Sequence, residues 1–426
     1  MSLLRSVYHF FFAFFAQLLF GFPSRKLVVV GVTGTKGKST TVDLLSSIFE
    51  AHGEKTAVLS TVRRRLPGAD GRNMTGNSMP GRFAIASFLR AAVKNGATHA
   101  FIEVTSEGVA QHRHRFIAWD AAVFLNLAPE HIESHGSFEK YRAAKVKFFR
   151  YLAHSRKHPK RFLINDDDTN ASFFSAAAQE IPGAELIRFS KQWFFTEAAT
   201  HNVNLGIAEN RRWLGEWLVP EFNIGNAAAA ARLALAYGIP WESVVKGFQI
   251  FQGTPGRMEF VQKKPFSVIV DYAHTPDSLE QVYRAARASF LGENDSLICV
   301  LGSAAGGRDT WKRPKMGRLA AEYCDAAVLT NEDPFDEDPM AILMEIERGF
   351  SEAAPRRLPS DQAWTIPDRR QAIRKALTLA KPGDVVLMTG KGTETSIRVA
   401  HGKKLPWNER QVAEEELKAL GFGGRE

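Results

Sequence analysis

The sequence has few cysteines and lacks the signatures of several common protein classes. Its two cysteines, Cys299 and Cys324, are too few for a disulfide framework or a metal cage, and this usage fits a reducing cytoplasm. No zinc-finger spacing, aromatic RNA-binding signature, internal repeat or long low-complexity tract occurs in the 426 residues. We therefore expect no nucleic-acid partner, although the formal net charge of +9 also suits a membrane surface or an anionic substrate.

Long hydrophobic runs are absent as well, except at the N-terminus. Residues 7–22 are almost all apolar and rich in Phe, and basic residues flank them. As a helix they would span about 24 Å, short of the ~30 Å hydrocarbon core of a bilayer, and His9 and Gln17 interrupt the run. No small-residue cleavage site follows, which argues against a signal peptide. Two interpretations stay open for residues 1–22: a helix lying on a membrane, or a helix docked on the protein itself.

Short β-branched runs alternate with stretches of helical spacing in the rest of the chain. Residues 26–32, 99–104 and 121–127 are typical of buried parallel strands, and residues 40–52 and 138–153 have helical spacing. This alternation predicts a doubly wound α/β fold.

Turn residues at 253–256 separate this pattern from a second alternating unit, in which SVIVDYAH, SLICVLG, AAVLT and DVVLMTG resemble strands. We expect an N-terminal hydrophobic segment at 1–22, an ATP-binding domain at 23–254 and a second α/β domain at 255–426.

A glycine-rich loop follows the first predicted strand and opens the first predicted helix. In such a loop, glycines let backbone N–H groups approach phosphates, and the helix N-terminus favours negative charge. Lys38 would reach the terminal phosphates of ATP, and Ser39 would offer its hydroxyl to Mg²⁺. The strict phosphate-loop pattern has glycine where this chain has Val32. The residues predicted to bind the nucleotide here are Gly34, Thr35, Gly37, Lys38, Ser39 and Thr40.

The departure at Val32 is itself informative, because TGTxGKST resembles the loop of Mur ligases and folylpolyglutamate synthases. Further motifs follow in the order that Mur ligases have them, and DYAHTPD and GKGTE are most similar to the MurE type. They are EVTSEG (103–108), FLNLAPEHIESHG (124–136), YRAAKVKFF (141–149), FNIGN (222–226), GRME (256–259), DYAHTPD (271–277), GGRDTWKRPKMG (306–317), DRRQAI (368–373) and GKGTE (390–394). The resemblance runs from about residue 26 to the end.

The resemblance implies a ligase with a central phosphate-loop ATPase domain and a C-terminal Rossmann-like domain. ATP would convert a muramoyl-peptide-like carboxylate into an acyl phosphate, and the amine of an amino acid would displace phosphate, as in peptidoglycan biosynthesis. Catalysis would then depend on positioning and on cations. The implied Mg²⁺ ligands are Ser39, Glu103, His131 and a carbamate formed on Lys145; from the residues alone, Lys145 would be a lysine on a helix surface.

The resemblance also assigns binding residues in both domains. Asn226, Arg257, Asp271 and His274 match positions near the nucleotide, and Arg257 would neutralise phosphate charge. The residues implied to contact the acceptor or the amino acid are Arg113, Glu332, Asp333, Phe335 and Glu394.

The chain departs from the MurE pattern in two respects. The loop begins near residue 31, which leaves no room for the UDP-binding domain of roughly a hundred residues that such ligases carry, so a partner or a lipid-linked acceptor is expected. Phe335 stands where diaminopimelate-selecting enzymes have arginine, and it cannot make a bidentate carboxylate contact. The neighbouring Glu332 and Asp333 would either face an amine or lie in a solvated loop.

Two other functions are compatible with parts of this sequence. A folylpolyglutamate-type ligase is disfavoured by DYAHTPD and GKGTE. A membrane-tethered ATP-binding regulator without ligase activity is disfavoured by the joint presence of Glu103, His131 and Lys145. The interpretation adopted is a monomeric, cytoplasmic ligase that uses ATP and Mg²⁺, and whose residues 1–22 contact a membrane surface or the protein itself.

Overall fold

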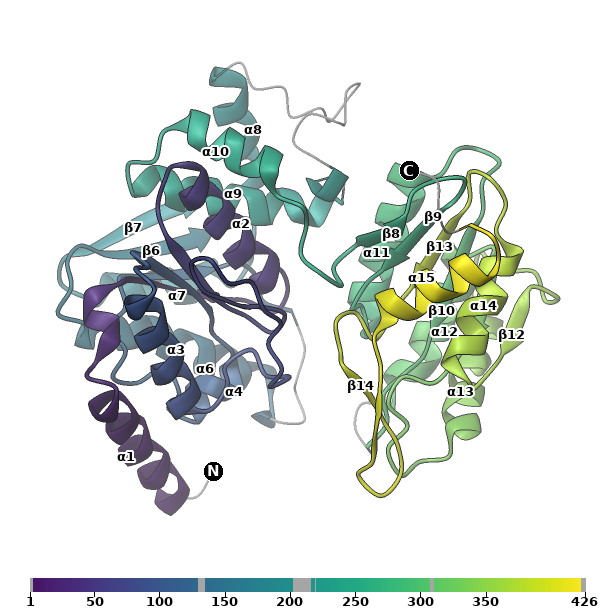
Figure 1. Ribbon diagram of the computed structural model, residues 1–426, viewed down its shortest axis with the longest axis horizontal. Helices are drawn as coiled ribbons and strands as arrows, with labels where there is room; N and C mark the ends of the chain where they lie inside the picture. The colour runs from purple at the N-terminus through teal and green to yellow at the C-terminus, as the bar shows by residue number, and fades with distance from the viewer. Residues whose placement is uncertain (1–2, 129–134, 202–215, 219, 307–309, 423–426) are drawn as a thin grey trace. The chain divides into compact units, whose positions relative to one another are not determined.

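The chain is divided into two units, each with its own sheet. The computed structural model describes residues 3–128, 135–201, 216–218, 220–306 and 310–422. The first unit is Met1–Gln252 and the second is Gly253–Glu426 (Figure 1). Each is built on its own mainly parallel sheet, which confirms the predicted α/β class.

Seven strands form the sheet of the first unit in the described part of the chain. Their order is β3-β2-β4-β1-β5-β6-β7, with β3 antiparallel to β2 and the other pairs parallel. Because β1 lies between β4 and β5, the carboxyl ends of these three strands meet at one edge, where α/β folds place ligands. The bounds are β1 Val28–Thr33, β2 Thr56–Leu59, β3 Arg64–Arg65, β4 His99–Glu103, β5 Ala121–Phe124, β6 Lys160–Asn165 and β7 Ala184–Phe189.

Helices cover both faces of this sheet (Figure 1). Val30 belongs to a core cluster with residues of α2, α9 and α10, whereas its neighbour Val29 belongs to a second cluster with residues of α3, α6 and α7. This division follows from the alternation of side chains along a strand. The bounds are α1 Leu3–Leu19, α2 Lys38–Ala51, α3 Arg82–Lys94, α4 Ser106–Ala110, α6 Phe138–Tyr151, α7 Ala171–Gln179, α8 Lys191–Thr200, α9 Glu221–Ala236 and α10 Trp241–Ile250.

The second unit repeats the plan with a six-stranded sheet in its described residues. The order is β12-β11-β10-β13-β9-β8, with β8 antiparallel to β9, and β14 and β15 form a separate antiparallel pair. The strands are β8 Glu259–Gln262, β9 Ser267–Val270, β10 Leu297–Leu301, β11 Ala326–Leu329, β12 Ala363–Thr365, β13 Val385–Met388, β14 Ser396–Arg398 and β15 Lys404–Pro406. The helices are α11 Pro276–Phe290, α12 Lys312–Tyr323, α13 Pro339–Arg348, α14 Arg369–Leu379 and α15 Glu409–Ala419.

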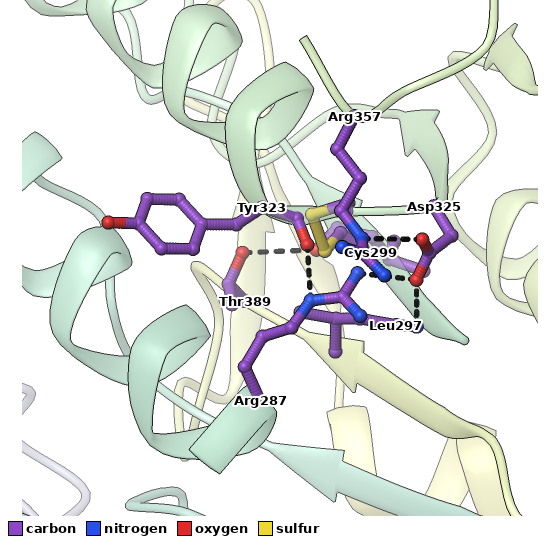
Figure 2. The surroundings of a disulfide bond; sticks show 9 residues. Arg287, Leu297, Cys299, Tyr323, Asp325, Arg357 and Thr389 are labelled. Atoms are coloured by element: carbon purple, nitrogen blue, oxygen red, sulfur yellow. Dashed lines mark hydrogen bonds and ion pairs between the residues drawn. A yellow bond between two sulfur atoms is a disulfide. The ribbon is translucent and has the colours of Figure 1, made fainter. Parts of the chain in front are cut away.

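The two cysteines, too few for a framework, form a disulfide with each other. Cys299 lies in the middle of β10 and Cys324 directly follows α12, with 6.1 Å between their Cα atoms. Beside the bond, the Asp325 carboxylate accepts hydrogen bonds from the Leu297 amide (2.7 Å) and the Arg357 guanidinium (2.6 Å), as Figure 2 shows. The pair was not predicted, because no spacing rule connects a cysteine inside a strand with one that follows a helix. The bond removes the argument from cysteine usage for a reducing cytoplasm, where disulfides are rare.

The N-terminal hydrophobic run forms α1, which lies beside α3 (Figure 1). One side of α1 is buried against the first unit through His9, Ala13, Ala16 and Gln17. In the part of the chain that the structure describes, no helix has both the length and the apolar character needed to span a bilayer.

Candidate functional site

The glycine-rich loop connects β1 to α2 and is braced by Asn126, which lies just beyond the end of β5. Asn126 Oδ1 accepts hydrogen bonds from the Thr35 amide (3.1 Å) and the Lys36 amide (2.9 Å), and Asn126 Nδ2 donates to the Lys36 carbonyl (3.1 Å). The Thr35 hydroxyl lies 3.1 Å from the Tyr141 hydroxyl of α6. Neither Asn126 nor Tyr141 was predicted as a site residue, although both lie inside motifs that carry the resemblance to Mur ligases.

Lys38 is the first residue of α2, and its side chain turns back over the loop. Its Nζ donates to the carbonyls of Gly34 (3.0 Å) and Thr35 (2.8 Å). Gly37, the N-cap of α2, has φ of 84°, which favours glycine, and a Cβ there would lie 2.1 Å from Asn226 Oδ1. Lys38 is therefore held where an anion at the helix N-terminus would meet both its ammonium and the loop amides.

Two oxygen donors meet next to this loop. The Ser39 hydroxyl at the start of α2 donates to Glu103 Oε1 at the end of β4, in direct contact. Glu103 is fully buried, and its Oε2 accepts from the amide (2.9 Å) and the hydroxyl (2.7 Å) of Thr61. Hydroxyl and carboxylate oxygens suit a hard cation, so these residues fit Mg²⁺. The third predicted ligand, His131, lies outside the described residues.

Lys145, on α6, contacts the same loop from the face of the sheet opposite to α2. It is 2% exposed, and its Nζ donates to the Gly34 carbonyl (2.7 Å) and lies 4.8 Å from the centre of the Tyr141 ring. The interpretation from the residues alone, a lysine on a helix surface, is wrong, because α6 packs this side of the helix against the loop. The carbonyl of Gly34 thus contacts both Lys38 and Lys145.

Asn226 and Thr40 complete the loop's surroundings in the first unit. Asn226 on α9 is buried, accepts from the Thr41 hydroxyl (3.4 Å) and donates to Asn223 Oδ1 (2.9 Å). Thr40 is buried in the first turn of α2. Asn226 therefore holds the first turn of α2 from the neighbouring helix α9. A residue that only capped its own helix would not make this contact.

Arg113 lies elsewhere in the first unit, after α4. Its guanidinium donates to the Met79 carbonyl and to Gln111 Oε1 (2.8 Å). Burial lowers the pKa of Arg113, and Glu107 opposes that effect. The structure neither brings Arg113 to the loop nor gives it a carboxylate hydrogen-bond partner among the described residues.

In the second unit, Asp271 braces the turn that carries Arg257. Asp271 is buried; its Oδ2 accepts from the Met258 amide (2.8 Å) and its Oδ1 from the Ala273 amide (2.7 Å). The Arg257 guanidinium stacks over the Tyr272 ring at 4.4 Å, and His274 Nδ1 lies 2.8 Å from the Tyr272 carbonyl. Asp271 therefore acts on backbone amides, as a positioning residue for the other two.

Glu332 lies beyond the carboxyl end of β11 and is buried, with Oε2 lacking a hydrogen-bond partner among the described residues. Burial raises the pKa of its carboxyl to about 7; Lys312, Lys391 and Arg369 lower it and Glu394 raises it. The solvated-loop interpretation is therefore wrong here.

Asp333 is buried beside Glu332 and is bound to a lysine that the sequence analysis did not assign. Lys391 Nζ contacts Asp333 Oδ1 (2.7 Å) and Glu394 Oε2 (2.5 Å). Phe335 has a left-handed φ of 48°, and the Arg398 guanidinium lies 5.7 Å from the centre of its ring. Four of the predicted substrate residues thus gather in one cluster of the second unit, together with Lys391 and Arg398.

Solved structures of two kinds share this two-unit fold. A 2,6-diaminopimelate ligase structure superposes with a TM-score of 0.58 at 26% identity, over 93% of this chain and 79% of that one. Escherichia coli FolC with ADP gives a TM-score of 0.65 at 20% identity, over 99% and 95%, and shows the fold alone. The fold is that of ligases with a phosphate-loop domain followed by a second α/β domain.

Comparisons of sequence narrow this class. The Mur ligase middle domain matches residues 32–234, and the Mur ligase glutamate ligase domain matches residues 256–392. A Roseiflexus UDP-N-acetylmuramyl-tripeptide synthetase is 36% identical over 96% of this chain and 82% of its own length. A diaminopimelate ligase of Thermosynechococcus vestitus is 35% identical over 95% and 79%. The chain belongs to the Mur ligase family, the ATP-dependent ligases of peptidoglycan biosynthesis.

Proposed function

We propose that the chain is a MurE-type ligase that adds an amino acid to a muramoyl-peptide-like carboxylate in the cytoplasm, as a monomer, using ATP and Mg²⁺. The observation that carries this is the convergence of Lys38, Lys145 and the Ser39–Glu103 pair around one glycine-rich loop. A loop that only bound ATP would need Lys38 and Ser39. It would not need a buried lysine approaching from a second helix.

The residues of the loop would each act on one part of the reaction. Backbone amides and Lys38 would hold the phosphates of ATP while the acceptor carboxylate attacks the γ-phosphorus and ADP leaves. Ser39 and Glu103 would hold Mg²⁺, together with His131 by resemblance, and the ion would offset phosphate charge. The amine of the amino acid then attacks the acyl carbon, loses a proton and displaces inorganic phosphate, which forms the amide.

Lys145 would serve as the carbamate that the resemblance implies. Its neutral amine would take up CO₂ and release one proton, which leaves an anionic group with two oxygens. One N–H remains on the nitrogen, so the hydrogen bond to the Gly34 carbonyl can persist. The change converts a cation, which would repel Mg²⁺, into an oxygen ligand that suits it.

An assay of phosphate release tests the function directly. The protein is given ATP, Mg²⁺, a muramoyl-dipeptide acceptor in UDP-linked or lipid-linked form, and a panel of amino acids. We expect phosphate release that requires both the acceptor and the amino acid. Release that requires neither would identify an ATPase or a regulator, and release with a folate acceptor and glutamate would identify a folylpolyglutamate-type ligase.

We further propose that the amino acid carries a terminal ammonium and is selected in the cluster around Glu332. Arg113 would contact the acceptor, and Arg257, Asp271 and His274 would lie near the nucleotide, with Asp271 acting through the backbone. Glu332 supports this choice, because its Oε2 has no hydrogen-bond partner in the described part of the chain and an ammonium would supply one. Glu394 would face the α-amino group.

Diaminopimelate is expected to be a poor substrate. Its distal carboxylate would meet Phe335 where related enzymes have arginine, and a buried carboxylate without its partner costs about 3 to 5 kcal/mol, or two or more orders of magnitude in discrimination. Comparing kcat/KM for lysine and diaminopimelate measures this. A preference for diaminopimelate would contradict the prediction. If that preference were then lost in Arg398→Ala but kept in the control Arg348→Ala, whose arginine is exposed, the guanidinium of Arg398 over Phe335 would have replaced the missing arginine.

Replacing Glu332 with glutamine is expected to stabilise the second unit at pH 8 and to have little effect at pH 5. The pKa of Glu332 in the folded protein, about 7, lies above the ordinary 4.5. The stability that protonated Glu332 contributes is therefore fully present below pH 4.5 and is lost as the pH rises through 7. The free energy of unfolding lost in this way is about 3 kcal/mol. Thermal unfolding at the two pH values measures the difference, with exposed Glu347→Gln as the control. Equal shifts in Tm at pH 5 and pH 8 would contradict it.

A further inference from the structure

Helix α1 directs its polar residues toward the protein. The Ser6 hydroxyl lies 2.8 Å from His112 Nε2, and His9 and Gln17 are buried. Phe10 and Phe14 pack edge-to-face on Phe116, with ring centres 5.1 and 5.3 Å apart. The side of the helix that contacts the first unit therefore contains the polar groups that an ordinary surface helix would turn to solvent.

The opposite side of α1 is apolar and exposed. Phe83, in the first turn of α3, is 39% exposed and lies next to Phe12, with 6.2 Å between the ring centres, so it extends this surface. Soluble monomers seldom leave so many large apolar side chains together in contact with water. The exposed residues of α1 include Tyr8, Phe11, Phe12, Phe15, Leu18 and Leu19, each between 39 and 71% exposed.

The surroundings of this apolar face are positively charged. No acidic residue occurs in residues 1–42, 71–102 or 108–119, which include α1, α3 and the segment under α1. Arg25 and Lys26 follow the helix and are exposed. Burial is the largest cause that lowers the pKa of His112, beneath α1, to about 4, and the nearby cations Arg115 and Lys147 act in the same direction.

We propose that the exposed face of α1, together with Phe83, Arg25 and Lys26, binds the surface of a bilayer that contains anionic lipid. The helix would lie in the plane of the interface, because its other side is committed to the first unit and no described helix can span a membrane. The apolar side chains would enter the boundary between headgroups and acyl chains, and the basic residues would contact the phosphates. A second copy of the chain fits less well, because two faces of the same positive sign would repel.

Sedimentation with vesicles tests this surface on the full chain. We expect the protein to pellet with vesicles of phosphatidylcholine and phosphatidylglycerol, and far less with phosphatidylcholine alone. The variant Phe11→Ser/Phe15→Ser/Leu18→Ser should bind about 100-fold more weakly, because each of these side chains has roughly half of its surface left to bury. Arg25→Gln/Lys26→Gln should weaken binding about tenfold and reduce its dependence on salt.

Matched substitutions elsewhere serve as controls. Ile250, Met344 and Leu405 are 49–52% exposed, like the three α1 positions at 51–54%, so the triple serine variant there should bind as the parent protein does. Lys403→Gln/Lys404→Gln is the corresponding charge control. All variants should keep the same Tm within a few degrees, since none removes a buried side chain.

Three outcomes would overturn the proposal. The first is equal pelleting with neutral and anionic vesicles, and the second is unchanged binding in the α1 triple variant. The third is a parent protein that is dimeric in solution and becomes monomeric in that variant, which would mean that a second copy covers the face. None of these results bears on the ligase assay, so the membrane surface and the function can fail separately.

Discussion

Lys38→Ala is expected to lower the rate of ATP-dependent ligation by about 10²- to 10³-fold or more, with little change in stability. The ammonium of Lys38 is held over the loop carbonyls, where it would meet the charge that develops on the transferring phosphoryl group. Its side chain is only half-buried, so its removal leaves no large cavity. The measurement is phosphate release at saturating ATP, together with thermal unfolding.

Lys55→Ala is the matched control, because Lys55 is exposed near the other end of α2 and its loss changes the net charge equally. It should ligate at the parent rate. A folded Lys38→Ala protein that also ligates at that rate would remove the assignment of the phosphate loop.

Lys145→Ala is expected to be nearly inactive, and added bicarbonate should not restore it. The substitution removes the only amine at this position that CO₂ could convert into a carbamate. Formate or acetate should restore part of the rate, by placing a carboxylate where the carbamate would lie. Rates with and without these acids are the measurement, and rescue distinguishes a missing anion from general damage to the fold.

Lys160 offers an unusually close control for this experiment. It is also buried in the first unit, and its Nζ also donates to a backbone carbonyl, that of Ala153 (3.3 Å), but on β6 and away from the loop. Lys160→Ala should lose stability without gaining any response to short acids. Full activity in Lys145→Ala, or equal rescue of both variants, would contradict the carbamate assignment.

The sequence predicted the elements on which the site is built, because their signals are local. A β-branched run before GKST determines β1, the loop and the start of α2. What the sequence could not predict are contacts between segments far apart in the chain. Examples are the burial of Lys145 against Gly34 and the bond between Lys391 and Asp333.

The acidic cluster of the second unit illustrates the same limit. The residues EDPF (332–335) are compatible with either a solvated loop or a binding site, because their sequence does not determine whether their side chains are buried. The charges around Glu332 come from α12, α14 and the segment after β13, which lie far apart in the sequence. The side of α1 that faces the protein was equally undetermined, since a run of Phe and Leu has no marked polar face.

The bond between Cys299 and Cys324 also bears on which parts of the second unit can open separately. It ties the end of α12 to the middle of β10, a central strand whose local unfolding would disrupt the whole sheet. Helices that open on their own do so when few bonds hold them to the core. Because α12 is joined covalently to that core at its C-terminal end, its last turn cannot separate from β10 while the bond is intact and belongs to the same cooperative unit as the strand.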